Sequence, residues 1–173
     1  MTDFEKLDSS TVFTGKVFSI DRDRVRMPNG RAVTLDVVRH PRSVVLVPIP
    51  ELGHVVLVRQ FRYAVNAFLW ELPAGSVDAG ESPEEAAVRE CHEEIGQVPS
   101  TVVRLAALYP TPGYCDEEMV FFRLSGLEQP PHAAALDEDE DIETRTFELR
   151  EAREMVRRGE IVDMKTIVGL GLV

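Results

Sequence analysis

The segment from Ser82 to Gly96 carries each local signal of a short helix, and these signals fix the register of the residues within it. Ser82 is a favourable N-cap, Pro83 suits the first helical position, and Glu85 can close a capping box with Ser82. Gly96 can close the other end, because glycine readily adopts the left-handed conformation that helix C-termini use. We therefore expect a helix here, and its faces can be assigned.

Two neighbouring faces of this helix differ in chemistry. At about 100° per residue the apolar side chains form one stripe, which contains Ala87, Val88, Cys91 and Ile95. Glu90, Glu93 and Glu94 share the adjoining arc, because residues three and four apart are surface neighbours. Like charges about 6 Å apart repel by roughly 3 kcal/mol per pair at an effective dielectric constant of about 20, and far less on a solvated helix. A bound cation would remove that repulsion.

Hard divalent cations take oxygen ligands, and Mg²⁺ usually binds through a few carboxylates together with substrate phosphates. The three glutamates are therefore a candidate site for a metal that also holds a phosphorylated substrate. The alternative is a solvated acidic face, which is common on exposed helices.

The residues around these glutamates resemble the Nudix box, in which a glycine, five residues, a glutamate and seven residues precede the pattern REUxEExGU, with U a bulky apolar residue. The matching positions are Gly75, Glu81, Arg89, Glu90, Cys91, Glu93, Glu94 and Gly96. Gln97 departs from the pattern, and Val98 can substitute for the missing apolar contact. The family cleaves a nucleoside diphosphate linked to another moiety. The resemblance implies an α/β fold, a Nudix-type α/β/α sandwich with a mixed sheet.

From about Val12 to Leu170 the chain looks most like the ADP-ribose pyrophosphatase branch of this family. Residues 58–63 and 70–75 resemble the approach to the box in that branch, and Arg62 there looks like a substrate-binding arginine. Pro112, sixteen residues after Gly96, resembles the proline that separates ADP-ribose enzymes from other members.

Residues 136–142 resemble an acidic loop that supplies a general base and a further metal ligand in this branch. Glu138 matches the base and Glu140 the ligand. The count of acids alone does not choose among Glu138, Asp139 and Glu140, and the alternative is an acidic loop that serves solubility. A base is best placed slightly outside the metal shell, because a carboxylate beside several cations is weakly basic.

The resemblance also implies the remaining roles. Glu90, Glu93, Glu94 and the main-chain carbonyl of Ala74 would hold Mg²⁺, with Mn²⁺ as the alternative ion. Arg89 would orient the glutamates, and Glu81 would brace the turn before the helix; Arg89 and Glu93 are thus grouped with Glu138 as catalytic residues. Phe18 and Arg39 are candidates for stacking and hydrogen bonding to adenine, and ordinary sheet packing is the alternative for both.

Composition limits the partners and the compartment. The chain has 173 residues, 44% of them apolar, with a formal charge of −11 and a pI of about 4.8. This charge argues against nucleic acid and anionic membranes, which are bound through basic patches. The only cysteines, Cys91 and Cys115, form no disulfide or zinc pattern. The N-terminus has no apolar run of the kind that a signal peptide requires, so we expect a cytoplasmic protein.

The strand patterns suggest an N-terminal antiparallel β unit over residues 1–42 and a Nudix domain over residues 43–173. In the first unit, strands are expected over 11–20, 23–28 and 31–39, with an Asn29-Gly30 hairpin turn. In the second, strands are expected over 43–49, 54–61, 68–72, 102–109, 119–124 and 142–149, and further helices over 151–158 and 164–170. A small β unit is marginal alone, so we expect it to be the arm of a homodimer; docking within its own chain is the alternative.

Together these patterns predict Mg²⁺-dependent hydrolysis of the pyrophosphate bond of ADP-ribose, giving AMP and ribose 5-phosphate. Two alternatives stay open. One is a pyrophosphatase for other nucleoside diphosphate sugars, because the box contacts only the shared diphosphate. The other is a Nudix-like sensor that binds a nucleotide without cleaving it, although such domains typically lose glutamates of the box and this chain keeps them.

Overall fold

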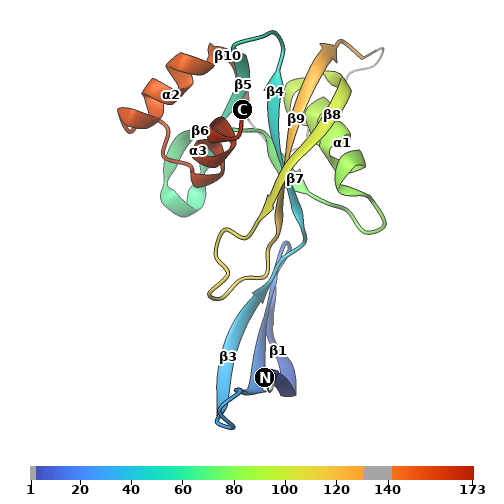
Figure 1. Cartoon of the computed structure of the whole chain (residues 1–173), viewed down its shortest axis with the longest axis vertical. Coiled ribbons are helices and arrows are strands. Elements are labelled where there is room, and N and C mark those ends of the chain that lie inside the picture. The colour runs from blue at the N-terminus through green and yellow to red at the C-terminus, as the bar shows by residue number, and fades with distance from the viewer. Residues whose placement is uncertain (1–2, 131–141) are drawn as a thin grey trace. The chain divides into compact units, whose positions relative to one another are not determined.

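The computed structural model describes residues 3–130 and 142–173, which form two compact units (Figure 1). Unit 1 comprises the described part of Met1–Arg42 together with Tyr109–Glu118. Unit 2 comprises Ser43–Leu108 and the described part of Met119–Val173. The predicted domains, residues 1–42 and 43–173, concern independent folding, and they stay a prediction.

Unit 1 contains a three-stranded antiparallel sheet in the order β1-β2-β3, with β1 at Glu5–Thr14, β2 at Ser19–Arg26 and β3 at Ala32–Arg39. The turn between β2 and β3 runs from Met27 to Gly30, whose N–H donates to the carbonyl of Met27 at 2.8 Å and whose φ is 82°. The expected two-residue Asn29-Gly30 turn was therefore wrong, because the connection also includes Pro28 and is closed by the N–H of Met27, which donates to the carbonyl of Arg31 at 2.8 Å.

The continuous strand expected over 11–20 was wrong, because the chain turns at Gly15, whose N–H donates to the carbonyl of Phe18 at 2.9 Å. A Cβ at Gly15 would lie 3.0 Å from the ring of Phe13, so glycine suits this tight turn.

Unit 2 contains two sheets. The first has the order β7-β4-β9-β8, with β7 at Ala74–Ser76, β4 at Ser43–Ile49, β9 at Met119–Glu128 and β8 at Val98–Leu108. β4 and β9 run parallel while the other pairs are antiparallel, so the sheet is mixed. The second is antiparallel in the order β10-β5-β6, with β10 at Glu143–Glu148, β5 at His54–Arg62 and β6 at Ala67–Glu71. A single turn of 3-10 helix, η1 at Tyr63–Val65, joins β5 to β6.

The apolar run of β4 is buried on both faces, as its lack of alternation requires. Val44 and Leu46 pack in one cluster with α1 (Pro83–Ile95), whereas Val45 and Val47 pack in a second cluster with β5, α2 (Leu149–Arg157) and α3 (Met164–Gly171). Figure 1 accordingly shows α1 on one side of the four-stranded sheet and α2 and α3 on the other. The expected mixed α/β architecture with helices on both sides is confirmed.

Among the described residues, no helix combines the length and the apolar character that crossing a membrane requires.

Candidate active site

Helix α1 begins and ends where its capping residues predict. The N–H of Glu85 donates to Oγ of Ser82 at 3.2 Å, and the N–H of Ser82 donates to Oε2 of Glu85 at 2.9 Å. Gly96 closes the helix with a positive φ of 67°. The buried stripe is shifted from the expected one: Ala86, Ala87 and Cys91 are buried, whereas Val88 and Ile95 are half-buried. Burial raises the pKa of the Cys91 thiol to about 12, so this thiol stays protonated.

Two of the three clustered glutamates are buried rather than solvated. Glu90 is 9% exposed and Glu94 is 6% exposed. The N–H of Ala74 donates to Oε2 of Glu94 at 3.3 Å. A Cβ built on Gly75 would lie only 2.0 Å from Cδ of Glu90, so the Glu90 carboxylate occupies space that any side chain at this position would fill. The Ala74–Gly75 backbone and the two carboxylates therefore lie against each other.

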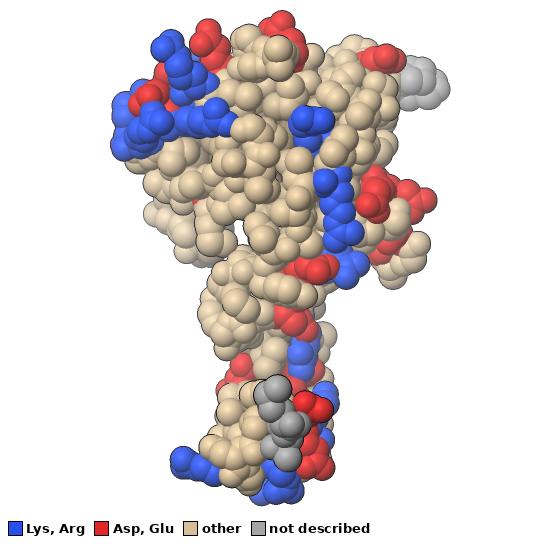
Figure 2. Space-filling view, viewed as in Figure 1, with Lys and Arg blue, Asp and Glu red and all other residues tan. Residues whose placement is uncertain are grey.

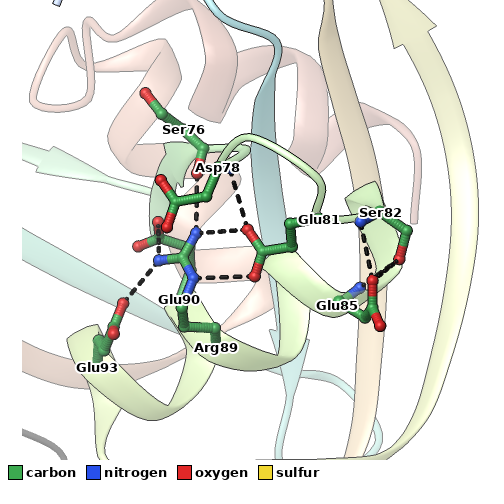
Figure 3. A network of polar contacts seen from close by, with 8 residues as sticks. All are labelled: Ser76, Asp78, Glu81, Ser82, Glu85, Arg89, Glu90 and Glu93. Carbon is green, nitrogen blue, oxygen red and sulfur yellow. Dashed lines mark hydrogen bonds and ion pairs between the residues drawn. The ribbon is translucent and has the colours of Figure 1, made fainter.

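Arg89 is the centre of a hydrogen-bonded network (Figure 3). Its Nε and Nη2 both donate to the Glu81 carboxylate at 3.0 Å, which is a bidentate contact. Its Nη1 donates to Oε1 of Glu90 at 2.7 Å and to Oε2 of Glu93 at 2.8 Å. One guanidinium thus orients three carboxylates from two turns of helix and the preceding loop.

The same arginine fixes the loop that enters the helix. Its Nη2 also donates to the main-chain carbonyl of Ser76 at 2.9 Å, and Glu81 in turn accepts from the N–H of Asp78 at 3.1 Å. The hydrogen bonds from Arg89 lower the pKa of Glu81, and the hydrogen bonds to Glu81 are the main cause that raises the pKa of Arg89. The loop from β7 to α1 is therefore held in one conformation by charged contacts.

The donor set suits a hard divalent cation. It offers two buried carboxylates and the half-exposed Glu93, all oxygen ligands of the type that such ions prefer. The Ala74 carbonyl as a further ligand stays a prediction. Within residues 3–130 and 142–173, no three acidic, histidine or cysteine side chains already converge as a closed cage, since Arg89 lies between Glu90 and Glu93. A cation would therefore bind beside the arginine, in a site that is rich in negative charge.

Arg62, the predicted substrate-binding arginine, lies at the end of β5 in the same unit. Its Nε donates to Oε1 of Glu71 at 2.9 Å and its Nη2 donates to Oε2 at 2.7 Å. These bonds are the main cause that raises the pKa of Arg62, and the negative charges of Glu94 and Asp163 contribute as well. Arg62 is thus electrostatically coupled to the glutamate cluster, and 41% of its side chain is exposed.

The other predicted substrate contacts lie in unit 1. Arg39 already holds three carboxylates, those of Asp21 at 3.1 Å, Asp23 at 2.6 Å and Asp116 at 3.1 Å. Phe18 is 40% exposed and stands 5.9 Å from the ring of Phe13. The roles of Arg39 and Phe18 in binding adenine stay predictions.

Pro112 lies in the Tyr109–Glu118 segment of unit 1. It lines an open pocket of about 380 Å³ together with Leu35, Val37, Tyr109, Gly113, Tyr114, Cys115 and Asp116. The segment is attached to β3 by the N–H of Val38, which donates to the carbonyl of Tyr114 at 2.8 Å.

Glu138 and Glu140, the predicted base and additional metal ligand, lie outside the described residues. The chain that follows them is placed near the cluster, because Oγ1 of Thr144 in β10 donates to the main-chain carbonyl of Glu94 at 3.4 Å. The roles of Glu138 and Glu140 as base and metal ligand stay predictions.

Sequence reasoning missed Glu71, Asp163, Lys165 and Thr166, which the structure connects to Arg62 and to the segment before Gly75. One signal was available: Glu71 interrupts an apolar strand, and an acid at such a position needs a cationic partner. The partner itself was not identifiable, since Lys165 lies 94 residues away along the chain.

Comparison with known proteins shows the family and the fold. The family model of the NUDIX domain matches residues 39–165. An ADP-ribose pyrophosphatase of Mycobacterium tuberculosis is 40% identical over 97% of this chain and 82% of its own length. An ADP-ribose pyrophosphatase of Bacillus subtilis is 34% identical over 90% of this chain and 84% of its own length. A crystal structure described as an ADP compounds hydrolase superposes with a TM-score of 0.86 at 23% identity, covering 99% of this chain and 92% of that one, and it shows the shared fold.

Proposed function

The chain belongs to the Nudix family, and from that premise we propose that it hydrolyses the pyrophosphate bond of ADP-ribose to AMP and ribose 5-phosphate. The observation that carries the proposal is the packing of the buried Glu90 and Glu94 carboxylates against the Ala74–Gly75 backbone. The names of the two bacterial relatives support the substrate.

The proposed cofactor is Mg²⁺, with Mn²⁺ as the alternative. Glu90, Glu93, Glu94 and the carbonyl of Ala74 would hold it, joined by Glu140 from the acidic segment. When bound, such a cation neutralises charge on the non-bridging oxygens of a diphosphate and stabilises the leaving phosphate. Arg89 keeps the carboxylates in position through its three-way contacts.

The remaining steps are assigned to side chains of this protein. Arg62 would bind a phosphate oxygen, because a guanidinium held by one carboxylate keeps further N–H donors for an anion. Glu138 would accept the proton of the attacking water. Glu138 is not part of α1, the helix that carries the other glutamates, which suits a base that should stand slightly outside the metal ligands.

Activity against a set of substrates tests the proposal. ADP-ribose, UDP-glucose, GDP-mannose, NADH and a diadenosine polyphosphate would be offered with Mg²⁺, and products identified by chromatography. The expected result is AMP and ribose 5-phosphate from ADP-ribose at the highest kcat/KM. A higher kcat/KM for another nucleoside diphosphate sugar would make that sugar the proposed substrate in place of ADP-ribose. Tight binding of ADP-ribose without cleavage of any compound would make the protein a sensor.

The proposal extends to a homodimer in the cytoplasm. Unit 1 exposes several large apolar side chains, namely Phe4, Val12, Phe13, Val17, Phe18 and Leu35. A three-stranded sheet has little core of its own, so a second copy that covers these side chains would stabilise it. Light scattering at micromolar concentration should give twice the 19.4 kDa mass of one chain; a single-chain mass would remove this part of the proposal.

A small-molecule substrate also suits the distribution of charge. Figure 2 shows basic side chains gathered over α2, where Arg157 pairs with Glu154 and Arg158 pairs with Glu151 and Glu160. Because these two arginines are matched by carboxylates, they offer little net attraction to a nucleic-acid backbone. The two cysteines, both free thiols, support a reducing compartment.

A further inference from the structure

Glu71, the last residue of β6, is a buried carboxylate held by two cations. It is 1% exposed, accepts two hydrogen bonds from Arg62, and accepts a third from Nζ of Lys165 in α3. Burial raises the pKa of this carboxyl, but the Arg62 and Lys165 contacts outweigh burial and lower it. Glu71 is therefore ionised, and its contacts with Arg62 and Lys165 compensate for its burial.

Lys165 is equally confined. Its side chain is 11% exposed, and Nζ also lies 3.1 Å from Oδ2 of Asp163, the N-cap of α3. Two cations and two carboxylates thus alternate along one chain of contacts, from Arg62 through Glu71 and Lys165 to Asp163. These alternating contacts fix the positions of the four side chains, because moving any one of them leaves a charge without its partner.

Helix α3 also supports the segment that leads to the glutamate cluster. Oγ1 of Thr166 accepts from the N–H of Leu72 at 2.7 Å, and a Cβ on Gly169 would lie 2.3 Å from Cδ1 of Leu72. Two residues later the N–H of Ala74 contacts Glu94. Helix α3 therefore packs against Leu72, which follows β6, and supports the segment that leads to Gly75.

We propose that Lys165 is a positioning residue for diphosphate binding, an inference that rests on the proposed function. By sharing Glu71 with Arg62, it holds the Arg62 guanidinium in one orientation. Nε and Nη2 of Arg62 are then engaged by Glu71, while Nη1 and the exposed edge are presented to a phosphate oxygen. Lys165 itself, at 11% exposure and between two carboxylates, does not contact the substrate.

The test compares Lys165→Met with Arg153→Met. Arg153 also anchors α3, through hydrogen bonds to the main-chain carbonyls of Leu170 and Val173, but it does not contact Glu71. Two readouts are measured: the affinity for ADP by calorimetry in EDTA, which needs neither metal nor turnover, and kcat and KM for ADP-ribose with Mg²⁺. Melting temperatures report how far each variant weakens the fold.

Lys165→Met should weaken ADP binding and raise KM by about tenfold with kcat within about twofold of the wild type, the signature of lost binding rather than lost chemistry. Arg153→Met should lower the melting temperature and leave ADP affinity and KM unchanged. In an Arg62→Met background, Lys165→Met should have no further effect on ADP affinity, because its action passes through Arg62.

Three results would overturn the inference: equal ADP affinity of the wild type and Lys165→Met, parallel loss of affinity in Arg153→Met, or additive losses in the double variant. If the wild type binds ADP but does not cleave ADP-ribose, the proposed function fails on its own, and the calorimetric comparison still decides the role of Lys165.

Discussion

Two groups of charged side chains contact the segment from Glu71 to Gly75, and they are balanced differently. Around Arg89, three carboxylates share one guanidinium, with the buried Glu94 close by. Around Glu71, two cations alternate with two carboxylates. Among these side chains, carboxylates outnumber cations in the first group, whereas the two are equal in number in the second. We expect the group around Arg89 to bind a cation, and the group around Glu71 to hold Arg62 in position.

The largest effect should come from removing charge in the unbalanced group. Glu94→Gln keeps the shape of the side chain but removes one carboxylate, so turnover should fall by about a hundredfold or more. The free energy of unfolding should change by less than about 1 kcal/mol, since the loss of one like charge relieves repulsion. Steady-state kinetics and chemical denaturation measure the two effects.

Glu84→Gln is the matched control for this change, because Glu84 is exposed in the first turn of the same helix. It should leave turnover unchanged. Full activity in Glu94→Gln, or a collapse of its melting temperature, would refute the assignment of α1 as the metal-binding helix.

The next largest effect should follow from filling the space of the Glu90 carboxylate. In Gly75→Ala the new methyl group would lie 2.0 Å from Cδ of Glu90, so the carboxylate must move away from the loop. We expect turnover to drop by about ten- to a hundredfold, as for the loss of a group that orients a metal ligand. Gly171→Ala has no neighbouring atom within 4 Å of its new methyl group and should retain full activity. Equal kinetics of the two variants would show that the close approach at Gly75 has no functional role.

The acidic segment 136–142 is predicted to add a general base and a metal ligand to the group around Arg89. Glu138→Gln should lower kcat while the Mg²⁺ concentration for half-maximal activity stays nearly constant, because a base is lost and the metal ligands remain. Glu140→Gln should raise that Mg²⁺ concentration as well. Titrating activity with Mg²⁺ separates the two roles, and unchanged kinetics in both variants would leave this segment as a solvated connector.

Sequence reasoning succeeded where the controlling contacts are local. Helix α1 follows from Ser82, Pro83 and Gly96, all within one short segment, and β4 from an uninterrupted apolar run. It failed at the turn at Gly15, since β-branched residues continue on both sides of a glycine, and at β7, whose three residues carry no strand pattern. At Gly15 and in β7 the structure depends on which backbone groups hydrogen-bond to each other, and the residue types do not show this.

The candidate site divides in the same way. The carboxylates of α1 lie on one face because of helix geometry alone, so their clustering follows from spacing. Their burial does not, because it depends on the packing of the Ala74–Gly75 loop over the helix. The contact between Glu71 and Lys165 joins residues 94 positions apart, and no local pattern links them.

The smallest expected effect concerns stability at low pH and sharpens the comparison at Arg89. The pKa of Glu81 is lowered from 4.5, first by its hydrogen bonds to Arg89. A carboxyl with a lowered folded-state pKa contributes stability above its unfolded pKa, and that contribution is lost as the pH falls from about 4.5 through the folded-state value. Arg89→Lys cannot make the bidentate contact, so it should cost about 1 kcal/mol at pH 7 after solvent screening. Protonated Glu81 carries no charge to pair with Arg89, so the difference in free energy of unfolding between Arg89→Lys and the wild type should shrink at pH 3.

Arg158→Lys, at an exposed pair with Glu151 and Glu160, is the control and should show no measurable loss of stability at either pH. Urea denaturation at both pH values measures the difference, and a cost that is the same at pH 7 and pH 3 would mean that Arg89 acts through packing rather than through its charge.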